Sequence, residues 1–405
     1  MSPKLAPESG LKVKAVSSFF MICSLIWLVS CGGGDSNSAT VSGLSNRAFV
    51  SNSQTFNMQI IDANNDQFST KSAGISVSTG VGLMALSPDK TKTLTFGSIT
   101  NTISVIDNTT ETVVASVTLG SFTESMAFLS DNKTALAAVR NEPVSGAPNG
   151  AVLVLDTSTP ALTATIPVPS VQTVIVSHNG NRALAFSDGT DSMAVIDTSA
   201  HTATTVPGFD RPVYGVFSSD DTKAYILSCG PECGGTTAKV TVLDMSSNTP
   251  GASVNVSAAT VGAMDTSGNL YVAGTAGAAG KLDVVNTGSL SVSNSGVAIT
   301  DGFHTRMLLV NTKLYIGART CTTPQCLTVF DTGAQTAIIA PCVVAQSFFC
   351  TPGDVTGFTA IDKRNVVYVI EGGKLLVYDL NSSTPLDERH QLDIVGNAVD
   401  VKNPD

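Results

Sequence analysis

One short pattern returns eight times along the chain: an alternating apolar run that ends in Asp or Asn and leads into a polar turn. It reads SVIDNT, LVLDTS and AVIDTS in three of its copies. Successive copies lie 41 to 49 residues apart, with the acidic or amide position at Asp62, Asp107, Asp156, Asp197, Asp244, Asn286, Asp331 and Asp379. A period near 45 residues is typical of propeller blades, each built from one repeating unit. The pattern therefore predicts a single large repetitive domain.

Each repeat contains further strand-like runs around this pattern. A run such as LTFGS or LYVAG lies upstream, after a turn such as LSPDKTK, and a run such as VVASVTLG lies downstream. Short alternating runs bounded by Gly, Asn, Asp and Pro turns indicate antiparallel strands. We therefore predict an all-β propeller of four-stranded antiparallel blades, with eight repeats counted and seven blades as the alternative. The first repeat lacks a first strand, and the C-terminal GNAVDV is predicted to supply it and close the ring.

The repeated Asp or Asn is interpreted as a turn residue at the end of each third strand. Its side chain accepts hydrogen bonds from backbone N–H groups two or three positions on. The functional alternative is a ring of eight ligands, but structural repetition predicts the same spacing. DANNDQ at Asp62 resembles half a calcium loop without its Gly and its terminal Glu, because Gln67 and Ala73 stand there. The sequence thus predicts no metal site and no cofactor.

The first 31 residues form a secretion signal. Lys4, Lys12 and Lys14 precede the apolar run AVSSFFMICSLIWLVS, which is shorter than the roughly 20 residues of a membrane span. The run ends in Leu28, Val29, Ser30 and Cys31, a pattern that resembles the lipid-attachment signal of bacterial lipoproteins. An uncleaved anchor or an ordinary signal peptide is the alternative. We expect residues 1–30 to be a signal peptide and Cys31 to carry the lipid.

The signal also indicates a cellular location and the domain limits. Gly32 after the cysteine resembles lipoproteins of the outer membrane, so we expect an exported, outer-membrane lipoprotein that faces the periplasm or the cell surface. Residues 31–44 are rich in Gly, Ser and Asn and are predicted to be a flexible tether. Residues 45–402 are predicted to form the propeller. The net charge of −10 and the lack of a Lys/Arg cluster argue against nucleic acid as a partner.

The turns and strands together resemble a known family. SPDK-like turns, followed by LYVAG-like and SVIDNTT-like strands, are similar to the YVTN repeats of β-propellers and to their lactonase-like relatives over about residues 45–400. The resemblance implies the fold and, less directly, a hydrolase that uses the central channel. Such a hydrolase needs a cluster of His, Arg and acids. The repeats do not show one, so we regard an enzyme as the less favoured interpretation.

Six cysteines follow Cys31, and all fall in the longer connections. Strand order places these connections on one face of the propeller and the short regular turns on the other. Neighbouring cysteines predict three disulfides, formed by Cys229 with Cys233, Cys321 with Cys326, and Cys342 with Cys350. A thiolate metal site is the alternative, but the spacing is not that of common zinc sites. We expect the disulfides mainly to hold the shape of these loops.

The candidate catalytic residues are few. His304 and Arg306 in GFHTR precede a predicted inner strand and are weak candidates for a site in the channel, with a solvated loop pair as the other interpretation. His178, His201 and His390 look like turn or outer-strand residues. We therefore expect a lipid-anchored binding or scaffold module of the cell envelope, with the disulfide-bearing face holding a protein, peptide or glycan. The lactonase-like hydrolase is the alternative.

Overall fold

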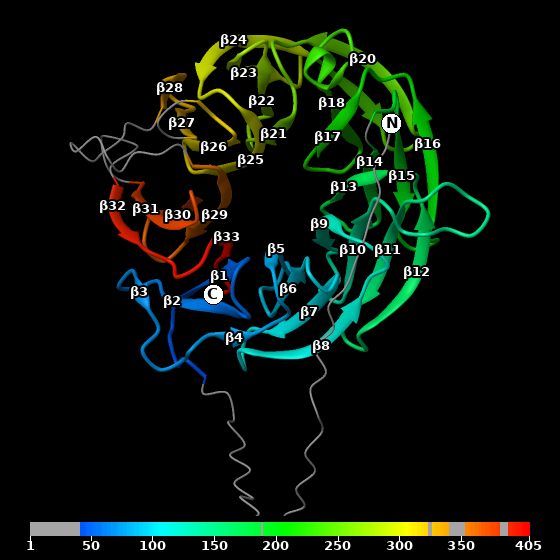
Figure 1. The fold of residues 1–405 in the computed structure, drawn as a ribbon. Helices are drawn as coiled ribbons and strands as arrows, with labels where there is room; N and C mark the ends of the chain where they lie inside the picture. The colour runs from blue at the N-terminus through cyan, green and yellow to red at the C-terminus, as the bar shows by residue number, and fades with distance from the viewer. Residues whose placement is uncertain (1–40, 188, 323–325, 340–352, 381–387) are drawn as a thin grey trace, which may run out of the picture. The chain divides into compact units, whose positions relative to one another are not determined.

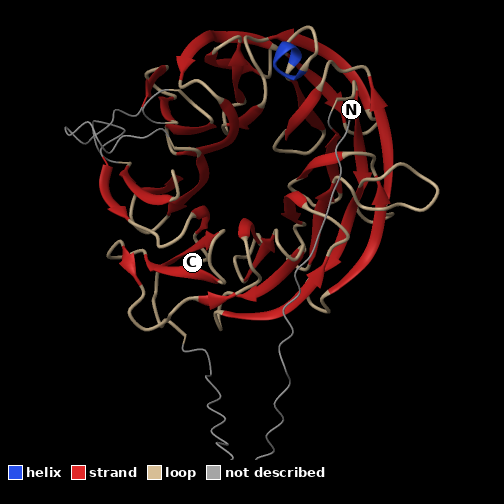
Figure 2. Ribbon diagram, viewed as in Figure 1, coloured by secondary structure: helices blue, strands red, loops and turns tan. Residues whose placement is uncertain are grey.

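The computed structural model describes residues 41–187, 189–322, 326–339, 353–380 and 388–405. These residues form 33 β-strands and one short 3-10 helix, η1 (Gly230–Cys233). Figure 2 shows strands throughout the described chain and a single helical turn. No helix in the described ranges is long and apolar enough to cross a membrane. The prediction of an all-β fold is confirmed.

The strands form eight antiparallel blades, numbered here from the N-terminus. The first four blades contain the following strands in order from the centre outward: blade 1, β33 (Ala398–Lys402), β1 (Arg47–Asn52), β2 (Asn57–Asp62) and β3 (Gln67–Phe68), with β4 (Ile75–Ser76) also paired to β2; blade 2, β5 (Val81–Leu86), β6 (Lys92–Gly97), β7 (Thr102–Asp107) and β8 (Thr112–Thr118); blade 3, β9 (Thr123–Phe128), β10 (Thr134–Val139), β11 (Ala151–Asp156) and β12 (Ala161–Pro167); blade 4, β13 (Val171–Val176), β14 (Arg182–Ser187), β15 (Ser192–Asp197) and β16 (Thr202–Pro207).

The other four blades follow the same order: blade 5, β17 (Pro212–Phe217), β18 (Lys223–Ser228), β19 (Lys239–Asp244) and β20 (Thr249–Asn255); blade 6, β21 (Val261–Met264), β22 (Asn269–Ala276), β23 (Ala279–Asn286) and β24 (Ser291–Ile299); blade 7, β25 (Phe303–Val310), β26 (Lys313–Arg319), β27 (Leu327–Asp331) and β28 (Thr336–Ile339); blade 8, β29 (Val355–Ile361), β30 (Val366–Glu371), β31 (Lys374–Asp379) and β32 (Glu388–Leu392). Eight blades are thus confirmed.

The inner strands contact one another in a closed series, from β33 through β5 and onward to β29, which contacts β33 again (Figure 1). The closing strand comes from the C-terminus, as predicted, because β33 pairs with β1 through Val50 and Val401. Closure by a strand from the far end of the sequence leaves no inner sheet edge unpaired. It also makes the last residues of the chain part of blade 1.

The hydrophobic core is divided among the boundaries between blades. Each boundary holds one cluster of buried side chains, eight in all. Neighbouring side chains in a strand point to opposite faces, so Leu270 of β22 packs against blade 5 whereas Tyr271 packs against blade 7. Both faces of the middle strands are therefore buried, and this explains why their sequences are almost continuously apolar.

The order of the strands gives the propeller two different faces. Connections between strands one and two, and between strands three and four, lie on one side, which we call the turn face. Connections between strands two and three, and those between blades, lie on the other, which we call the loop face. The described chain starts on the turn face, because β1 is a second strand that begins there. Ser42, inside the range predicted as tether, is already buried and bonds to Glu111 of blade 2 through its backbone N (2.6 Å) and its Oγ (2.5 Å).

A network of charges joins the two ends of the described chain on the turn face. Arg47 of β1 donates to Asp405 (2.6 Å), to Glu111 (2.9 Å) and to the carbonyl oxygen of Asn108 (2.6 Å). Glu111 belongs to the turn between β7 and β8, so this network ties blade 1 to blade 2. On the other side of blade 1, Arg364 of blade 8 pairs with Asp66. Buried charges of this kind are stable only when they are paired and hydrogen-bonded.

Candidate functional site

The eight repeated Asp and Asn residues each stand at the last position of a third strand. Asp107 is representative, since its Oδ1 accepts from the backbone N–H groups of Thr109 (2.8 Å) and Thr110 (2.9 Å). Comparable bonds to backbone N–H groups are present at Asp62, Asp156, Asp197, Asp244, Asn286 and Asp331. The turn after Asp379 lies outside the described residues. These side chains belong to separate blades, and the described part of the chain contains no group of three or more His, Cys, Asp or Glu arranged to hold a metal ion.

A basic residue faces the repeated Asp across the sheet in five blades, a feature that the sequence analysis missed. The first residue of the second strand is paired in register with the last residue of the third, and this first residue is Arg47, Lys92, Arg182, Lys223 or Lys313. Two of these residues bridge to the Asp of their own blade, Arg182 to Asp197 and Lys313 to Asp331. In line with this, the pKa of Asp331 is lowered, mainly by its bond to Lys313. The basic residue that opens the second strand in five of the eight blades was the available signal.

Two disulfides hold connections on the loop face. Cys229 is bonded to Cys233 in the connection that contains η1, and Cys321 to Cys326 in the equivalent connection of blade 7. The pair predicted between Cys342 and Cys350 lies outside the described residues. Disulfides are compatible with an exported protein. Each disulfide closes a loop between the second and third strands of its blade, and these two strands remain regularly paired.

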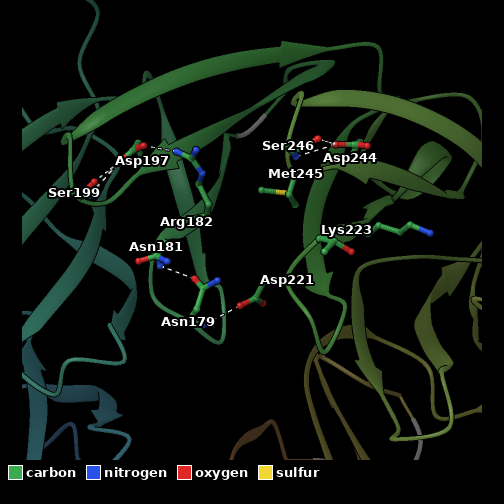
Figure 3. A pocket seen from close by; sticks show the side chains of 11 residues that line it. Asn179, Asn181, Arg182, Asp197, Ser199, Asp221, Lys223, Asp244, Met245 and Ser246 are labelled. Atoms are coloured by element: carbon green, nitrogen blue, oxygen red, sulfur yellow. Dashed lines mark hydrogen bonds and ion pairs between the residues drawn. The ribbon is translucent and has the colours of Figure 1, made fainter.

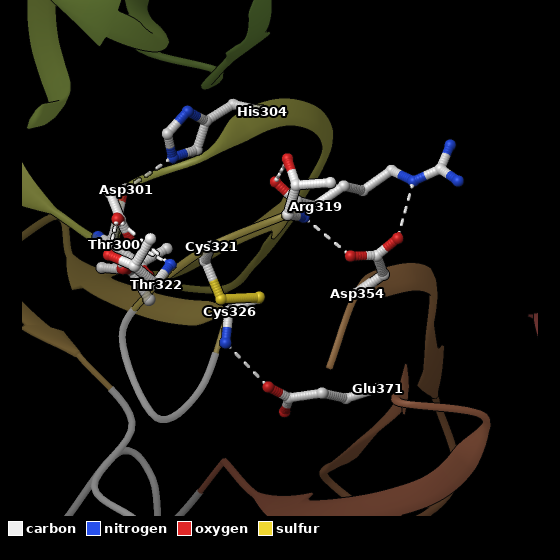
Figure 4. Close-up of a disulfide and its surroundings, with 11 residues drawn as sticks. Thr300, Asp301, His304, Arg319, Cys321, Thr322, Cys326, Asp354 and Glu371 are labelled. Atoms are coloured by element: carbon white, nitrogen blue, oxygen red, sulfur yellow. Dashed lines mark hydrogen bonds and ion pairs between the residues drawn. A yellow bond between two sulfur atoms is a disulfide. The ribbon is translucent and has the colours of Figure 1, made fainter. Parts of the chain in front are cut away.

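Two aspartate carboxylates brace the disulfide loops, and sequence reasoning did not identify them. In blade 5, Asp210 precedes the first strand and accepts from the backbone of Thr236 and Thr237 (3.0 and 2.8 Å). In blade 7, Asp301 occupies the same place and accepts from the backbone of Thr322 (3.0 Å) (Figure 4). An Asp shortly before the first strand, in the blades that carry Cys pairs, was the only sequence signal.

Each disulfide loop is also tied to the next blade. Glu232, within the first loop, accepts from the backbone N–H of Thr275 in blade 6 (2.7 Å), and burial raises the pKa of this carboxyl group. In the second loop, the backbone N–H of Cys326 donates to Glu371 of blade 8 (2.8 Å) (Figure 4). The two disulfide loops therefore connect neighbouring blades in addition to forming part of the loop face.

The structure separates His304 from Arg306. His304 lies in β25 and is 1% exposed, so a solvated loop pair is the wrong interpretation for it. A bulge at Thr305 breaks the strand alternation, and the His304 ring turns to the carbonyl oxygen of Thr300 (3.0 Å). Burial lowers the pKa of His304 to about 4, which keeps the imidazole neutral. Arg306 is half-buried. Burial raises the pKa of Tyr214 in blade 5, and the positive charge of Arg306 partly opposes that rise.

The connections that carry exposed, large apolar side chains lie on the loop face. Eleven large hydrophobic residues are exposed, and five of them lie in loop-face connections or at a strand end beside one: Phe56, Ile99, Phe122, Phe303 and Val395. Five of the other six lie on outer strands, and the last, Val41, lies in the segment that enters β1 from the turn face. None of the eleven lies in a turn-face connection of the described chain. Four of the five loop-face residues belong to blades 1 and 2 or to the connections next to them.

A small cavity of about 200 Å³ adjoins this apolar surface, between blades 3 and 4. Phe122 forms one wall and is held edge-on against Phe96 with 5.2 Å between ring centroids. Glu124 and Arg140 provide charged groups at its margin. An aromatic wall with a few polar groups is the usual composition of a recognition pocket.

The described unit thus defines the chain as an eight-bladed β-propeller closed by its C-terminal strand. No protein-family model matches the sequence, and no curated protein matches it. The chain is similar in structure to the solved dihydro-heme d1 dehydrogenase NirN in complex with DHE, at a TM-score of 0.67 and 16% identity over 89% of this chain and 75% of that one.

Two further solved structures share the fold. One is a functionally unknown protein from Desulfotomaculum acetoxidans, with a TM-score of 0.52 and 16% identity over 73% of this chain and 94% of that one. Another is the β-propeller domain of Cps50 (Swd1) from Myceliophteria thermophila, with a TM-score of 0.53 and 9% identity over 71% and 92%. At these identities the likeness establishes the fold alone.

Proposed function

We propose that this propeller is an exported binding module, anchored by a lipid on Cys31, whose loop face holds a protein or peptide partner. The observation that carries the proposal is the distribution of exposed apolar side chains, which are found on loop-face connections and not on described turn-face connections. Exposed apolar groups gathered on one face mark an interaction surface in many soluble proteins. Rigid strands beneath the loops reduce the entropy that binding must overcome.

The place where the described chain begins supports the same arrangement. Ser42 is fixed to Glu111 on the turn face. The segment from Cys31 to Ser42 spans roughly 40 Å at most when fully extended. In this proposal, the segment that carries the lipid joins the propeller at the turn face, on the side opposite the partner surface. The proposed location is the outer membrane, because Gly32 and the preceding signal resemble those of outer-membrane lipoproteins.

The lactonase-like alternative gains no support from the candidate catalytic residues. It requires His304 and Arg306 to act together on a substrate in the channel. The ring of His304 is buried, has a lowered pKa and bonds to the carbonyl oxygen of Thr300, and a bulge at Thr305 lies between it and Arg306. We therefore do not propose hydrolysis.

Two matched triple variants test the binding proposal with full-length protein purified in detergent. Phe56→Ser/Ile99→Ser/Val395→Ser removes the three most exposed loop-face side chains. Val114→Ser/Leu162→Ser/Ile338→Ser removes comparable exposed side chains from outer strands. We expect proteins from envelope extract to be captured by the wild type and by the outer-strand variant, and to be lost from the loop-face variant. Equal capture by both variants, or equal loss, would contradict the proposal, once circular dichroism has shown that both are folded.

A further inference from the structure

A second cavity lies on the opposite, turn face, between blades 4 and 5. Its volume is about 660 Å³, and its walls come from the turns that follow β13, β15, β17 and β19 (Figure 3). This size falls within the range of sites for small organic ligands. The cavity is separate from the loop face, so an occupant here is independent of the partner proposed above.

One side chain at the boundary of blades 4 and 5 is smaller than its counterparts at several other boundaries. The third residue of the second strand packs toward the next blade, and in blades 5 to 8 it is a tyrosine: Tyr225, Tyr271, Tyr315 and Tyr368. In blades 2, 3 and 4 it is a leucine: Leu94, Leu136 and Leu184. Leu184 therefore leaves more room beside blade 5 than a tyrosine would.

The basic residue at the start of the second strand also leaves this space open in blade 4. In blades 1 and 2 the basic first residue of the second strand crosses to the next blade, Arg47 to Glu111 and Lys92 to Thr157. In blade 4 the same position is Arg182, which bonds instead to Asp197 of its own blade (2.5 Å) (Figure 3). Arg182 therefore lines the space without crossing it.

The walls are polar and already held in place. Asp221 accepts from the backbone N–H of Asn179 (2.8 Å), and Asn179 in turn accepts from that of Asn181 (2.8 Å). Asp244 accepts from the backbone N–H of Ser246 (2.8 Å) through its Oδ1. Within the described ranges, the side-chain amide of Asn181 takes part in no hydrogen bond or ion pair. The bonded side chains, Asn179, Asp221 and Asp244, lose little entropy when a ligand binds, and the amide of Asn181 is available to it.

The chemistry of the lining restricts the class of occupant. Three carboxylates and two cations line the cavity, together with two amides, so the charges largely offset one another and disfavour a strongly charged ligand. Met245 is the one apolar side chain among them and is itself 6% exposed. Amide, guanidinium and carboxylate groups together offer closely spaced donors and acceptors, which match hydroxyl groups that both donate and accept.

We propose that the cavity between blades 4 and 5 binds a neutral saccharide of two or three linked sugar units. Adjacent hydroxyl groups are bonded by the Asn181 amide, Arg182 and Asp244, and the methyl group of Met245 packs beneath a sugar ring. This site is additional to the proposed loop-face function and does not depend on it.

Calorimetric titration of the full-length protein in detergent tests the proposal. The neutral probes are cellobiose, maltose and N,N′-diacetylchitobiose, and the anionic probes are digalacturonate and inorganic phosphate. We expect at least one neutral disaccharide to bind, and Asp244→Asn and Asn181→Leu each to raise its Kd by about tenfold, because a charged or amide hydrogen bond is lost. Leu184→Tyr, which gives blade 4 the residue of blades 5 to 8, should abolish binding.

The control is Asp107→Asn, the same substitution at the equivalent turn of blade 2, and it should leave the Kd unchanged. Asn286 shows that Asn fits this turn position. The proposal is wrong if no neutral probe binds at millimolar concentration or if only the anionic probes bind. It is also wrong if Asp107→Asn weakens binding as much as Asp244→Asn. Asn181→Leu alters an exposed turn rather than the core, so it remains informative even if Leu184→Tyr fails to fold.

Discussion

Arg47→Met tests how strongly the ring is fastened between blades 1 and 2. The Arg47 side chain is 11% exposed and its partner Glu111 is 2% exposed. The substitution keeps most of the apolar stem but removes the guanidinium group. Glu111 then remains buried with the Ser42 bonds and without its positive partner. Removing one member of a buried ion pair costs about 3–5 kcal/mol of unfolding free energy, because the other charge is left uncompensated.

Urea denaturation of full-length protein, followed by circular dichroism, measures this loss. For a domain of this size the same loss lowers the Tm by roughly 1–2 °C per kcal/mol, or about 3–10 °C in all. Lys313→Met is the matched control, since Lys313 occupies the same strand position but pairs within its own blade and at a more exposed site. It should cost about 1 kcal/mol or less.

The double variant Arg47→Met/Glu111→Gln separates the two contributions. If the cost arises from the unpaired carboxylate, removing its charge should restore part of the stability lost in Arg47→Met. A loss below about 1 kcal/mol for Arg47→Met, or a double variant that is less stable than the single one, would refute the reasoning.

Three further outcomes follow from the structure. Burial lowers the pKa of His304 from 6.5 to about 4, so the unfolding free energy should be full above pH 6.5 and fall by about 3 kcal/mol as the pH drops toward 4. His304→Val should remove this fall, as measured by urea titrations at pH 7 and 4.5. Valine is chosen because it stands at the equivalent bulge position in blades 2, 4 and 8. Cys229→Ser/Cys233→Ser should cost about 2 kcal/mol and raise hydrogen exchange at Thr275, whose N–H bonds to Glu232; an unchanged exchange rate would show that the disulfide does not position this loop. Cys31→Ser should move the protein from the membrane fraction to the soluble fraction, and retention in the membrane would contradict the lipid anchor.

The propeller was predictable because its physical causes are local and repeated. Third strands end in a residue that makes the same local turn bonds. Asp107 and Asp156 therefore mark the ends of their strands in the sequence without any need for tertiary contacts. The missing first strand of the first repeat also pointed to β33, since a ring closed by hydrogen bonds needs a partner for β1. Because the apolar run that ends in Asp or Asn occurs eight times, a weak match in one repeat does not hide the fold.

The environment of His304 was not predictable, for a reason that is also physical. Its flanking residues are typical of a turn, but the residue belongs to a strand with a bulge at Thr305. A bulge changes which side chains face inward without leaving a clear mark in the sequence. Val81, Val171 and Val355 occupy the equivalent position in other blades, so an alignment of the blades by register identifies a buried site.

The cavity between blades 4 and 5 escaped prediction because it depends on a combination of residues. Leu184 is smaller than the tyrosines of blades 5 to 8, but Leu94 and Leu136 hold the same position in blades 2 and 3. The orientation of Arg182 depends on a choice between its own blade and the next, and both types of partner are found at this strand position. The sequence shows that a basic residue is present, whereas only the folded structure shows which partner its side chain contacts.

The two faces of the propeller carry different constraints, and this difference explains where variation is tolerated. Every turn-face connection must complete the end of a blade, and several also fasten neighbouring blades, as His178 and Asn179 do through Asp221. Loop-face connections begin and end at strands that are already paired, so their length and composition affect the ring less. The disulfide of blade 5 and the exposed side chain of Phe56 can therefore be present in one blade without being repeated in the next. A binding surface that differs from blade to blade arises more readily on the loop face, whereas a cavity on the turn face requires the loss of a packed side chain.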